Sequence, residues 1–321
     1  MFEAEAAFRD RSGRLAGAWP DDGRPLELVP TAGLDGCEPI VAVDDLPGAA
    51  DVYGSRLRER TGRRAAVVVG NERRGIGGDL RAAAHQAVRI PMAAGPLNCL
   101  NVAAAAAVAL YYLAGPSGRG RMAARPSPAR HRPELLLAAP GDPVEAGSSI
   151  RSAACFGWRR VLLADDEKVW FGVDRHTITQ GRAAARRARN PISVVPVTAD
   201  RPPSAFERVV VVTTEPGGPP LHQVDLARGD QLVVVPDGDG GAGWEGAGRR
   251  AITASLDVRA GSRFRLLASI VLAEVARQVG RPARVRSRRP AGPARRPSYD
   301  LAIRFAGQTG ELVAFQELLD Y

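Results

Sequence analysis

The feature that most constrains the fold lies in residues 67–104, where two short apolar strands each run into a polar or glycine-rich loop. The first strand ends in Gly70-Asn71-Glu72, with further glycines at 75, 77 and 78. About twenty residues later, Ile90-Pro91-Met92 leads through a loop to Asn98 and then to an alanine-rich helix. Strands of β-branched residues that alternate with helices are typical of parallel sheets with covered faces. The segment therefore predicts an α/β fold.

The same alternation continues along the chain, and hydrophobic periodicity places its elements. We expect strands at 39–43, 65–69, 88–91, 134–138, 160–164, 194–197, 208–213 and 231–235. We expect helices at 46–60, 79–87, 101–114, 146–156 and 265–279. The stretches 115–132 and 281–297 are rich in Arg, Pro and Gly, which is typical of linkers. This pattern predicts domains at 1–114 and 133–280, a basic linker at 115–132, and a basic linker with a C-terminal extension (a final strand and helix) at 281–321.

Composition narrows the possible partners. The net charge of the 321 residues is +9, and Lys168 is the only lysine, so arginine supplies almost all of the positive charge. A basic, arginine-rich protein favours nucleic-acid binding, because the guanidinium group binds phosphate in a bidentate manner. The three cysteines and four histidines are scattered, so we expect no disulfide framework and no metal site. We also expect no signal peptide, no membrane span and a cytoplasmic location.

The two motifs of residues 67–104 resemble the cofactor-binding motifs of SPOUT methyltransferases of the SpoU type, which methylate RNA ribose 2′-hydroxyls with S-adenosylmethionine. The resemblance implies a deep trefoil knot at least in the first half of the chain. It implies catalytic positions for Glu72 and Asn101, which would orient the hydroxyl and the loops. It also implies that S-adenosylmethionine is held by Val69, Gly70, Asn71, Gly75, Ile90, Met92 and Leu100.

The second half resembles the same family through a different motif. Residues 145–157 match the arginine motif at Gly147, Arg151 and Phe156-Gly157, which makes Arg151 the candidate activator of the hydroxyl. Glu145 stands where the family usually has asparagine, and Cys99, in the first half, where it usually has serine. The second half lacks the cofactor motifs, since 236–238 and 264–270 depart from them. The first half lacks an arginine motif, which would fall before residue 1.

These losses are complementary. SpoU enzymes act as homodimers, in which the cofactor of one protomer meets the arginine of the other. The resemblance therefore implies two SPOUT-like α/β-knot domains in tandem, forming an intramolecular pseudodimer that is monomeric and has one composite active site. The expected reaction is methylation of a ribose 2′-hydroxyl in rRNA or tRNA. A catalytically inactive SPOUT-like RNA-binding protein, and a methyltransferase with a non-RNA acceptor, remain alternatives.

Several of these residues also have plain structural interpretations. Glu72 fits a helix cap, and Asn101 fits the N-cap of the alanine-rich helix, a role compatible with catalysis. Arg151 fits an ordinary surface arginine in a chain with so many. One further cluster is either a solvated helix face or a contact to the RNA backbone: Arg182, Arg186, Arg187 and Arg189.

Overall fold

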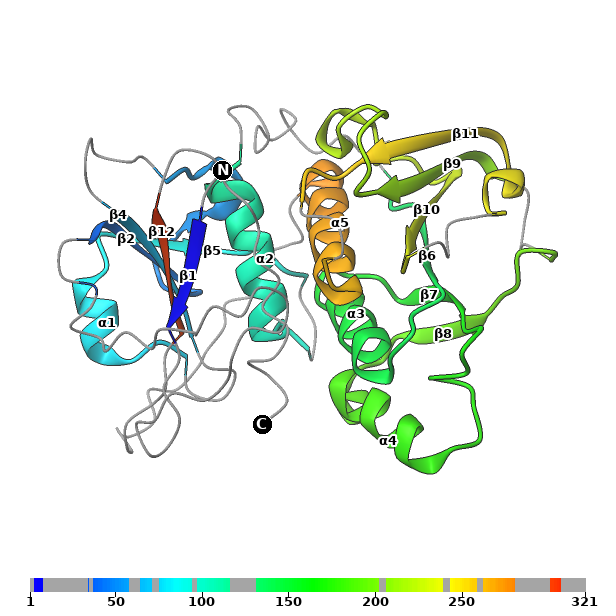
Figure 1. Ribbon diagram of the computed structural model, residues 1–321, viewed down its shortest axis with the longest axis horizontal. Helices are drawn as coiled ribbons and strands as arrows, with labels where there is room; N and C mark the ends of the chain where they lie inside the picture. The colour runs from blue at the N-terminus through cyan, green and yellow to red at the C-terminus, as the bar shows by residue number, and fades with distance from the viewer. Residues whose placement is uncertain are drawn as a thin grey trace. The chain divides into compact units, whose positions relative to one another are not determined.

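The computed structural model describes residues 3–7, 34, 37–57, 64–70, 75–93, 97–115, 131–201, 206–238, 243–258, 262–280 and 301–306. The chain divides into two compact units, which Figure 1 shows. The first unit comprises Met1–Ile90, Ala105–Arg121 and Val285–Tyr321, and the second comprises Pro91–Ala104 and Met122–Arg284. The described residues of each unit form a six-stranded sheet, and each unit is treated separately below.

The sheet of the first unit has the strand order β1-β12-β4-β2-β5-β3. Its strands are β1 (Glu3–Ala7), β2 (Cys37–Val43), β3 (Ala50–Asp51), β4 (Arg64–Val69), β5 (Gln86–Arg89) and β12 (Leu301–Ala306). Strands β4, β2, β5 and β3 pair in parallel, as the valine-rich patterns predict. Strand β12 extends the sheet by pairing antiparallel with β4, and β1 in turn pairs antiparallel with β12. A parallel sheet with an antiparallel edge is a common arrangement in α/β proteins.

Helix α1 (Gly78–Ala83) belongs to the first unit, as does most of α2 (Val102–Leu113), whose first three residues are assigned to the second unit. Helix α2 is apolar throughout and almost wholly buried, as expected for a helix without a polar face. Its Tyr112 ring packs edge-on against Tyr53, with 4.8 Å between the ring centroids. The carbonyl of its last residue accepts a hydrogen bond from Leu57 N–H at 3.0 Å, which satisfies one of the carbonyls that have no partner within the helix.

The helix expected at 46–60 is wrong over its described part, 46–57. Apolar residues there do recur at helical spacing, but Gly48 adopts φ +85°, which ends any helical run. The chain then forms β3, which pairs with β5, and a short 3₁₀ turn, η2, at Val52–Gly54. Helix α1 is also shorter than predicted and ends at Ala83, because the chain enters β5 at Gln86.

The sheet of the second unit is parallel throughout, with the order β11-β9-β10-β6-β7-β8. Its strands are β6 (Glu134–Ala138), β7 (Arg160–Ala164), β8 (Ser193–Pro196), β9 (Phe206–Thr213), β10 (Gln231–Pro236) and β11 (Gly248–Ser255). One face packs into a cluster that includes Leu136, Leu162, Val209 and Val234, and Trp244 covers it. Because side chains alternate along a strand, the other set of leucines and valines faces the opposite side.

Three helices form a row along one side of this sheet in Figure 1: α3 (Pro143–Cys155), α4 (Arg175–Ala184) and α5 (Phe264–Val279). Helix α3 begins at the N-cap Asp142, whose Oδ1 accepts from the N–H groups of Val144 and Glu145 at 2.7 and 3.0 Å. Helices α3 and α4 approach closely at two glycines. A Cβ atom added to Gly147 would lie 2.1 Å from the Gly181 carbonyl oxygen, so the contact requires glycine. No helix among the described residues is long and apolar enough to cross a membrane.

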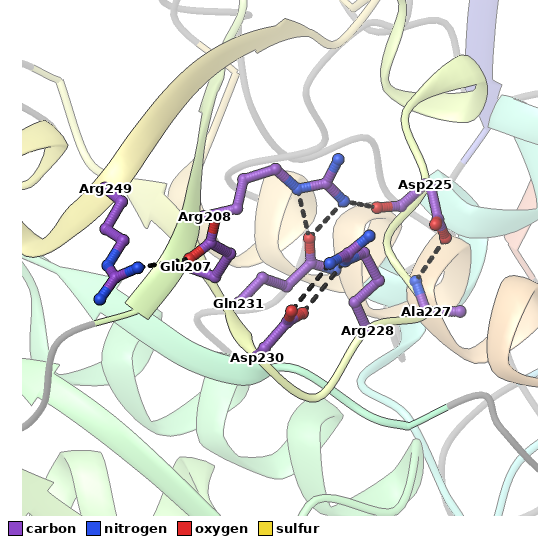
Figure 2. A network of polar contacts seen from close by, with 8 residues as sticks. All are labelled: Glu207, Arg208, Asp225, Ala227, Arg228, Asp230, Gln231 and Arg249. Carbon is purple, nitrogen blue, oxygen red and sulfur yellow. Dashed lines mark hydrogen bonds and ion pairs between the residues drawn. The ribbon is translucent and has the colours of Figure 1, made fainter.

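A polar network ties together the amino-terminal ends of β9 and β10, as Figure 2 shows. Arg208 and Gln231 are register partners on these two parallel strands, and Arg208 Nε donates to Gln231 Oε1 at 3.0 Å. Burial lowers the pKa of Arg208. At the turn into β10, Arg228 and Asp230 pair at 2.8 Å, and this bond lowers the pKa of Asp230. The network therefore holds together the amino-terminal ends of β9 and β10, at the opposite edge of the sheet from the carboxyl ends of its strands.

Candidate active site around Arg151

Arg151 lies on α3 and is buried, with only 3% of its surface exposed, so the interpretation as a surface arginine is wrong. Its Nε donates to the Cys99 carbonyl at 2.7 Å, and its Nη2 donates to the Leu100 carbonyl at 2.9 Å. The same Nη2 lies 3.1 Å from Cys99 Sγ. All these residues belong to the second unit. A charged donor contributes about 1.5–3 kcal/mol per hydrogen bond, so these contacts hold the guanidinium and the 99–100 loop in one arrangement.

The segment that carries Cys99 is also attached to the end of α3. Ala93 N–H donates to the Cys155 carbonyl at 2.8 Å. Gly157, the glycine of the predicted Phe-Gly pair, adopts φ +92°, and a Cβ atom there would lie 2.9 Å from the Ala93 Cβ. Residue 157 therefore favours glycine for two reasons: its backbone is left-handed, and a Cβ atom would be too close to Ala93. The arginine motif therefore contacts the segment that carries Ala93 and Cys99 at two points, Arg151 and Gly157.

Two cysteines lie at this junction. Cys155 is fully buried, and desolvation raises the pKa of its thiol to about 12, although the nearby Arg151 acts in the opposite direction. The thiol therefore stays protonated at neutral pH, and Cys155 packs as a small apolar residue. Cys99 is half-buried, and its sulfur is the side-chain group that lies beside Arg151 Nη2.

Glu145 stands in the asparagine position of the arginine motif, and it contacts the start of α5. Its Oε2 accepts from the Arg265 backbone N–H at 2.8 Å, and its Oε1 lies 3.4 Å from Arg265 Nε. Burial raises the pKa of this carboxyl, whereas Arg265 and Arg263 lower it. A carboxylate at the first turn of a helix satisfies otherwise unpaired N–H groups. The Glu145 carboxylate thus caps the helix at residues 264–270. These residues fall where the first half has its Asn98–Ala104 motif.

In the first unit, Gly70 lies in close contact with Gly75 and Ile76. Val69 ends β4 and is buried. A Cβ atom on Gly70 would lie 2.5 Å from the Gly75 carbonyl carbon and 2.6 Å from Ile76 N, so only glycine fits. Gly75 itself adopts φ +72°. Asn71 and Glu72 lie outside the described residues, so their expected cofactor and catalytic roles stay predictions.

The remaining cofactor positions follow β5. Ile90 comes directly after this strand and is buried, and it lies in the first unit. Met92 is half-buried and Leu100 is buried, and both belong to the second unit. Asn101 Oδ1 accepts from Ala103 N–H at 2.9 Å, so this side chain caps α2, as one of its two interpretations predicts. Gly70 and Ile90 follow the carboxyl ends of parallel strands, where α/β sheets commonly bind ligands.

The four arginines of the cluster at 182–189 differ in their exposure and in their contacts. Arg182 is exposed on α4, and Arg189 is exposed beyond its end. Arg186 adopts φ +49° and is half-buried. Arg187 is exposed, but its Nη1 donates to the Asn190 and Ile192 carbonyls at 2.8 and 2.7 Å and therefore supports the loop before β8.

The partners of Arg151 had only a weak signal in the sequence. They are mainly backbone carbonyls, which any residue carries, and only the unusual cysteine at 99 marked the position. Among the described residues, no group of three or more His, Cys, Asp and Glu side chains is placed to hold a metal ion.

Comparison with known proteins follows this geometry. The sequence model of the SpoU rRNA methylase family matches residues 34–111. No curated protein is significantly similar to the chain. One similar solved structure is an RNA 2′-O ribose methyltransferase, 20% identical, with 66% of this chain and 80% of that chain covered and a TM-score of 0.35.

Two other similar structures are the SpoU methyltransferase AviRb from Streptomyces viridochromogenes and an AdoMet-bound rRNA methyltransferase from Sinorhizobium meliloti. AviRb is 20% identical, with 47% of this chain and 62% of that chain covered and a TM-score of 0.34. The Sinorhizobium protein is 15% identical, with 48% and 60% covered and a TM-score of 0.35. The family match includes the Gly70 and Asn98 motifs, so it confirms the resemblance of residues 34–111 to the SpoU rRNA methylase family.

Proposed function

We propose that the chain is an S-adenosylmethionine-dependent RNA methyltransferase that acts on a ribose 2′-hydroxyl of rRNA or tRNA. The observation that carries the proposal is the buried Arg151, which is bound to the carbonyls of Cys99 and Leu100. In the resemblance to SpoU enzymes, Leu100 is a cofactor-binding position and Arg151 is the residue that activates the ribose hydroxyl. The family match over residues 34–111 supports the same reaction.

The residues present fit the cofactor. Buried apolar side chains at Ile90 and Leu100 suit an adenine ring, and the glycine turn at Gly70 brings main chain close to main chain, where N–H and C=O groups bind polar edges. S-adenosylmethionine would supply the methyl group. We propose that Val69, Gly70, Asn71, Gly75, Ile90, Met92 and Leu100 hold it, in a knotted arrangement typical of the family.

Arg151 acts by position and charge. A guanidinium does not lose its proton in proteins, so Arg151 is no ordinary base. Held by two carbonyls, it places a fixed positive charge beside the 99–100 loop, where it would stabilise the negative charge that develops on a ribose oxygen. Glu72 and Asn101 would orient the hydroxyl. Each chain would thus contain one active site, formed by the cofactor motifs of its first half and the arginine of its second half, and would act as a monomeric pseudodimer.

Calorimetric titration with S-adenosylmethionine, together with transfer of labelled methyl groups to rRNA and tRNA, tests the proposal. We expect about one equivalent bound per chain, and loss of transfer in Arg151→Ala and Arg151→Lys with cofactor binding kept. Arg160→Ala is the matched control, because Arg160 is a half-exposed arginine of the same unit that pairs only with Glu134 among the described residues. Two equivalents, or full activity in Arg151→Ala, would overturn the one-site proposal. RNA binding without cofactor binding would identify an inactive RNA-binding protein.

A further inference from the structure

The loop between β7 and α4 presents two large apolar side chains to solvent. Phe171 is 44% exposed and Val173 is 98% exposed, and the described residues contain no other exposed large hydrophobic side chain. An isolated apolar residue on a surface needs no explanation. Here, however, the backbone of the loop is built to hold Phe171 in place, and the helix that follows is rich in arginine.

Three contacts fix the loop. The Asp165 carboxylate accepts from Phe171 N–H at 2.7 Å and from Trp170 N–H at 3.0 Å. Trp170 is buried, and its ring lies against Gly181 of α4, where an added Cβ atom would be 3.4 Å away. A Cβ atom on Gly172 would lie 2.2 Å from the Lys168 carbonyl oxygen, so the turn is as tight as glycine permits. Trp170 anchors the loop to α4, while the adjacent Phe171 stays exposed.

Helix α4, which begins four residues after Phe171, carries a concentration of positive charge. Residues 171–189 include five arginines and a histidine but one acid, Asp174. Asp174 is engaged in capping the helix, since its Oδ2 accepts from Thr177 N–H at 2.7 Å. Arg175 and Arg182 are exposed, two helical turns and about 10 Å apart along the axis. Neither makes an ion pair within the part of the chain that the structure describes.

We propose that Phe171, Arg175 and Arg182 form a binding surface for single-stranded RNA, which we call the α4 surface. Phe171 stacks on an unpaired base, and the two arginines bind phosphates on either side of it. An exposed, rigid aromatic ring beside cations is how proteins bind single strands without reading their sequence. The excess of arginine favours a polyanion over a protein partner. The acids Asp166 and Glu167 lie in the first part of the loop, so the arginines of the segment are all on its α4 side in the sequence.

This inference rests on RNA as the proposed acceptor. It names a second surface, separate from Arg151, that binds the same RNA. Fluorescence anisotropy with a labelled twelve-nucleotide single-stranded RNA tests it across a range of salt concentrations. We expect Phe171→Leu to weaken binding about ten-fold and Phe171→Trp to preserve it, because only an aromatic face stacks on a base. Arg182→Ala should reduce the slope of log K against log salt by about 0.7, the value for one phosphate of a single strand, whereas Phe171→Leu leaves the slope unchanged.

Arg201→Ala is the matched control, because Arg201 is an 89% exposed arginine of the same unit, outside the α4 surface. We expect it to alter neither affinity nor slope. Undiminished RNA binding by Phe171→Leu and Arg182→Ala would overturn the inference and leave the methyltransferase proposal standing. A wild-type protein that binds neither this single strand nor rRNA or tRNA would overturn both. If Phe171→Leu instead abolished self-association in sedimentation while RNA affinity stayed the same, Phe171 would serve a protein contact and the inference would be wrong.

Discussion

At the scale of single residues, Gly70 offers a direct test of the cofactor turn. Its missing Cβ atom is what lets β4 lead into a turn that returns to Gly75 and Ile76. We expect Gly70→Ala to weaken S-adenosylmethionine binding at least ten-fold and to lower the free energy of unfolding by about 1–3 kcal/mol, the usual cost of overpacking. Calorimetry and urea denaturation measure the two effects. Gly78→Ala is the matched control, because an added Cβ there meets nothing within 4 Å. Equal cofactor affinity in both variants would contradict the expectation.

Burial of the Cys155 thiol leads us to expect that the free energy of unfolding falls at alkaline pH. The folded pKa of this thiol is raised to about 12 from an ordinary value of 9.0, because burial disfavours the thiolate. The folded state therefore keeps a proton that the unfolded state loses. The stability contributed by this group is complete below pH 9 and is lost as pH rises from 9 towards 12, by about 1.4 kcal/mol per pH unit.

Urea denaturation at pH 8 and pH 10.5 measures this loss. Other groups also titrate in this range, so the informative quantity is the difference between the wild type and Cys155→Ala. We expect the variant to lose less stability than the wild type over the same interval. Identical losses would show that the thiol is already solvated in the folded protein.

At the scale of elements, the α3–α4 contact joins the arginine motif to the α4 surface. Gly147 on α3 and Gly181 on α4 allow the two backbones to approach, and Gly147 lies one helical turn before Arg151. We expect Gly147→Ala to lower the free energy of unfolding by about 1–3 kcal/mol, because the new methyl group overlaps a carbonyl oxygen. Gly246→Ala, where an added Cβ has no neighbour within 4 Å, should change it by less than about 0.5 kcal/mol. Similar costs in the two variants would show that the helices separate freely.

Elements with a strong apolar pattern could be predicted from the sequence. Strands β6 and β7 have the predicted bounds, because in each a charged first residue is followed by a short run of four apolar residues. Helix α4 was predicted only as one of two interpretations of the arginines at 182–189, and strand β11 was not predicted. Helix α4 is short and mostly polar, and β11 is an edge strand whose side chains are largely exposed, so neither has a clear apolar period. Tertiary pairing decides such segments, and a single sequence does not encode it locally.

The candidate site shows the same limit. Arg151 could be predicted, because its motif consists of side chains at fixed spacing. Its partners could not, because two of its contacts are with carbonyl oxygens, which every residue has. The cap that Glu145 gives to α5 joins residues 120 positions apart, a distance at which spacing carries no information.

At the scale of the whole molecule, the decisive property is whether one chain supplies a complete active site. If it does, a chain that lacks the arginine and a chain that lacks the cofactor turn have no means of repairing one another. We therefore expect a mixture of Arg151→Ala and Gly70→Ala proteins to be as inactive in methyl transfer as either variant alone. A homodimer with shared sites would regain activity on mixing, because some mixed pairs combine an intact turn with an intact arginine.

The mixing experiment needs two supporting measurements. Sedimentation equilibrium should give the mass of one chain for the wild type, and circular dichroism should show that both variants are folded. The double variant, which carries both substitutions in one chain, is the negative control, and the wild type diluted with either variant should retain activity in proportion to its amount. Restored activity in the mixture would replace the intramolecular site with one assembled from two chains, while leaving the roles of Gly70 and Arg151 intact.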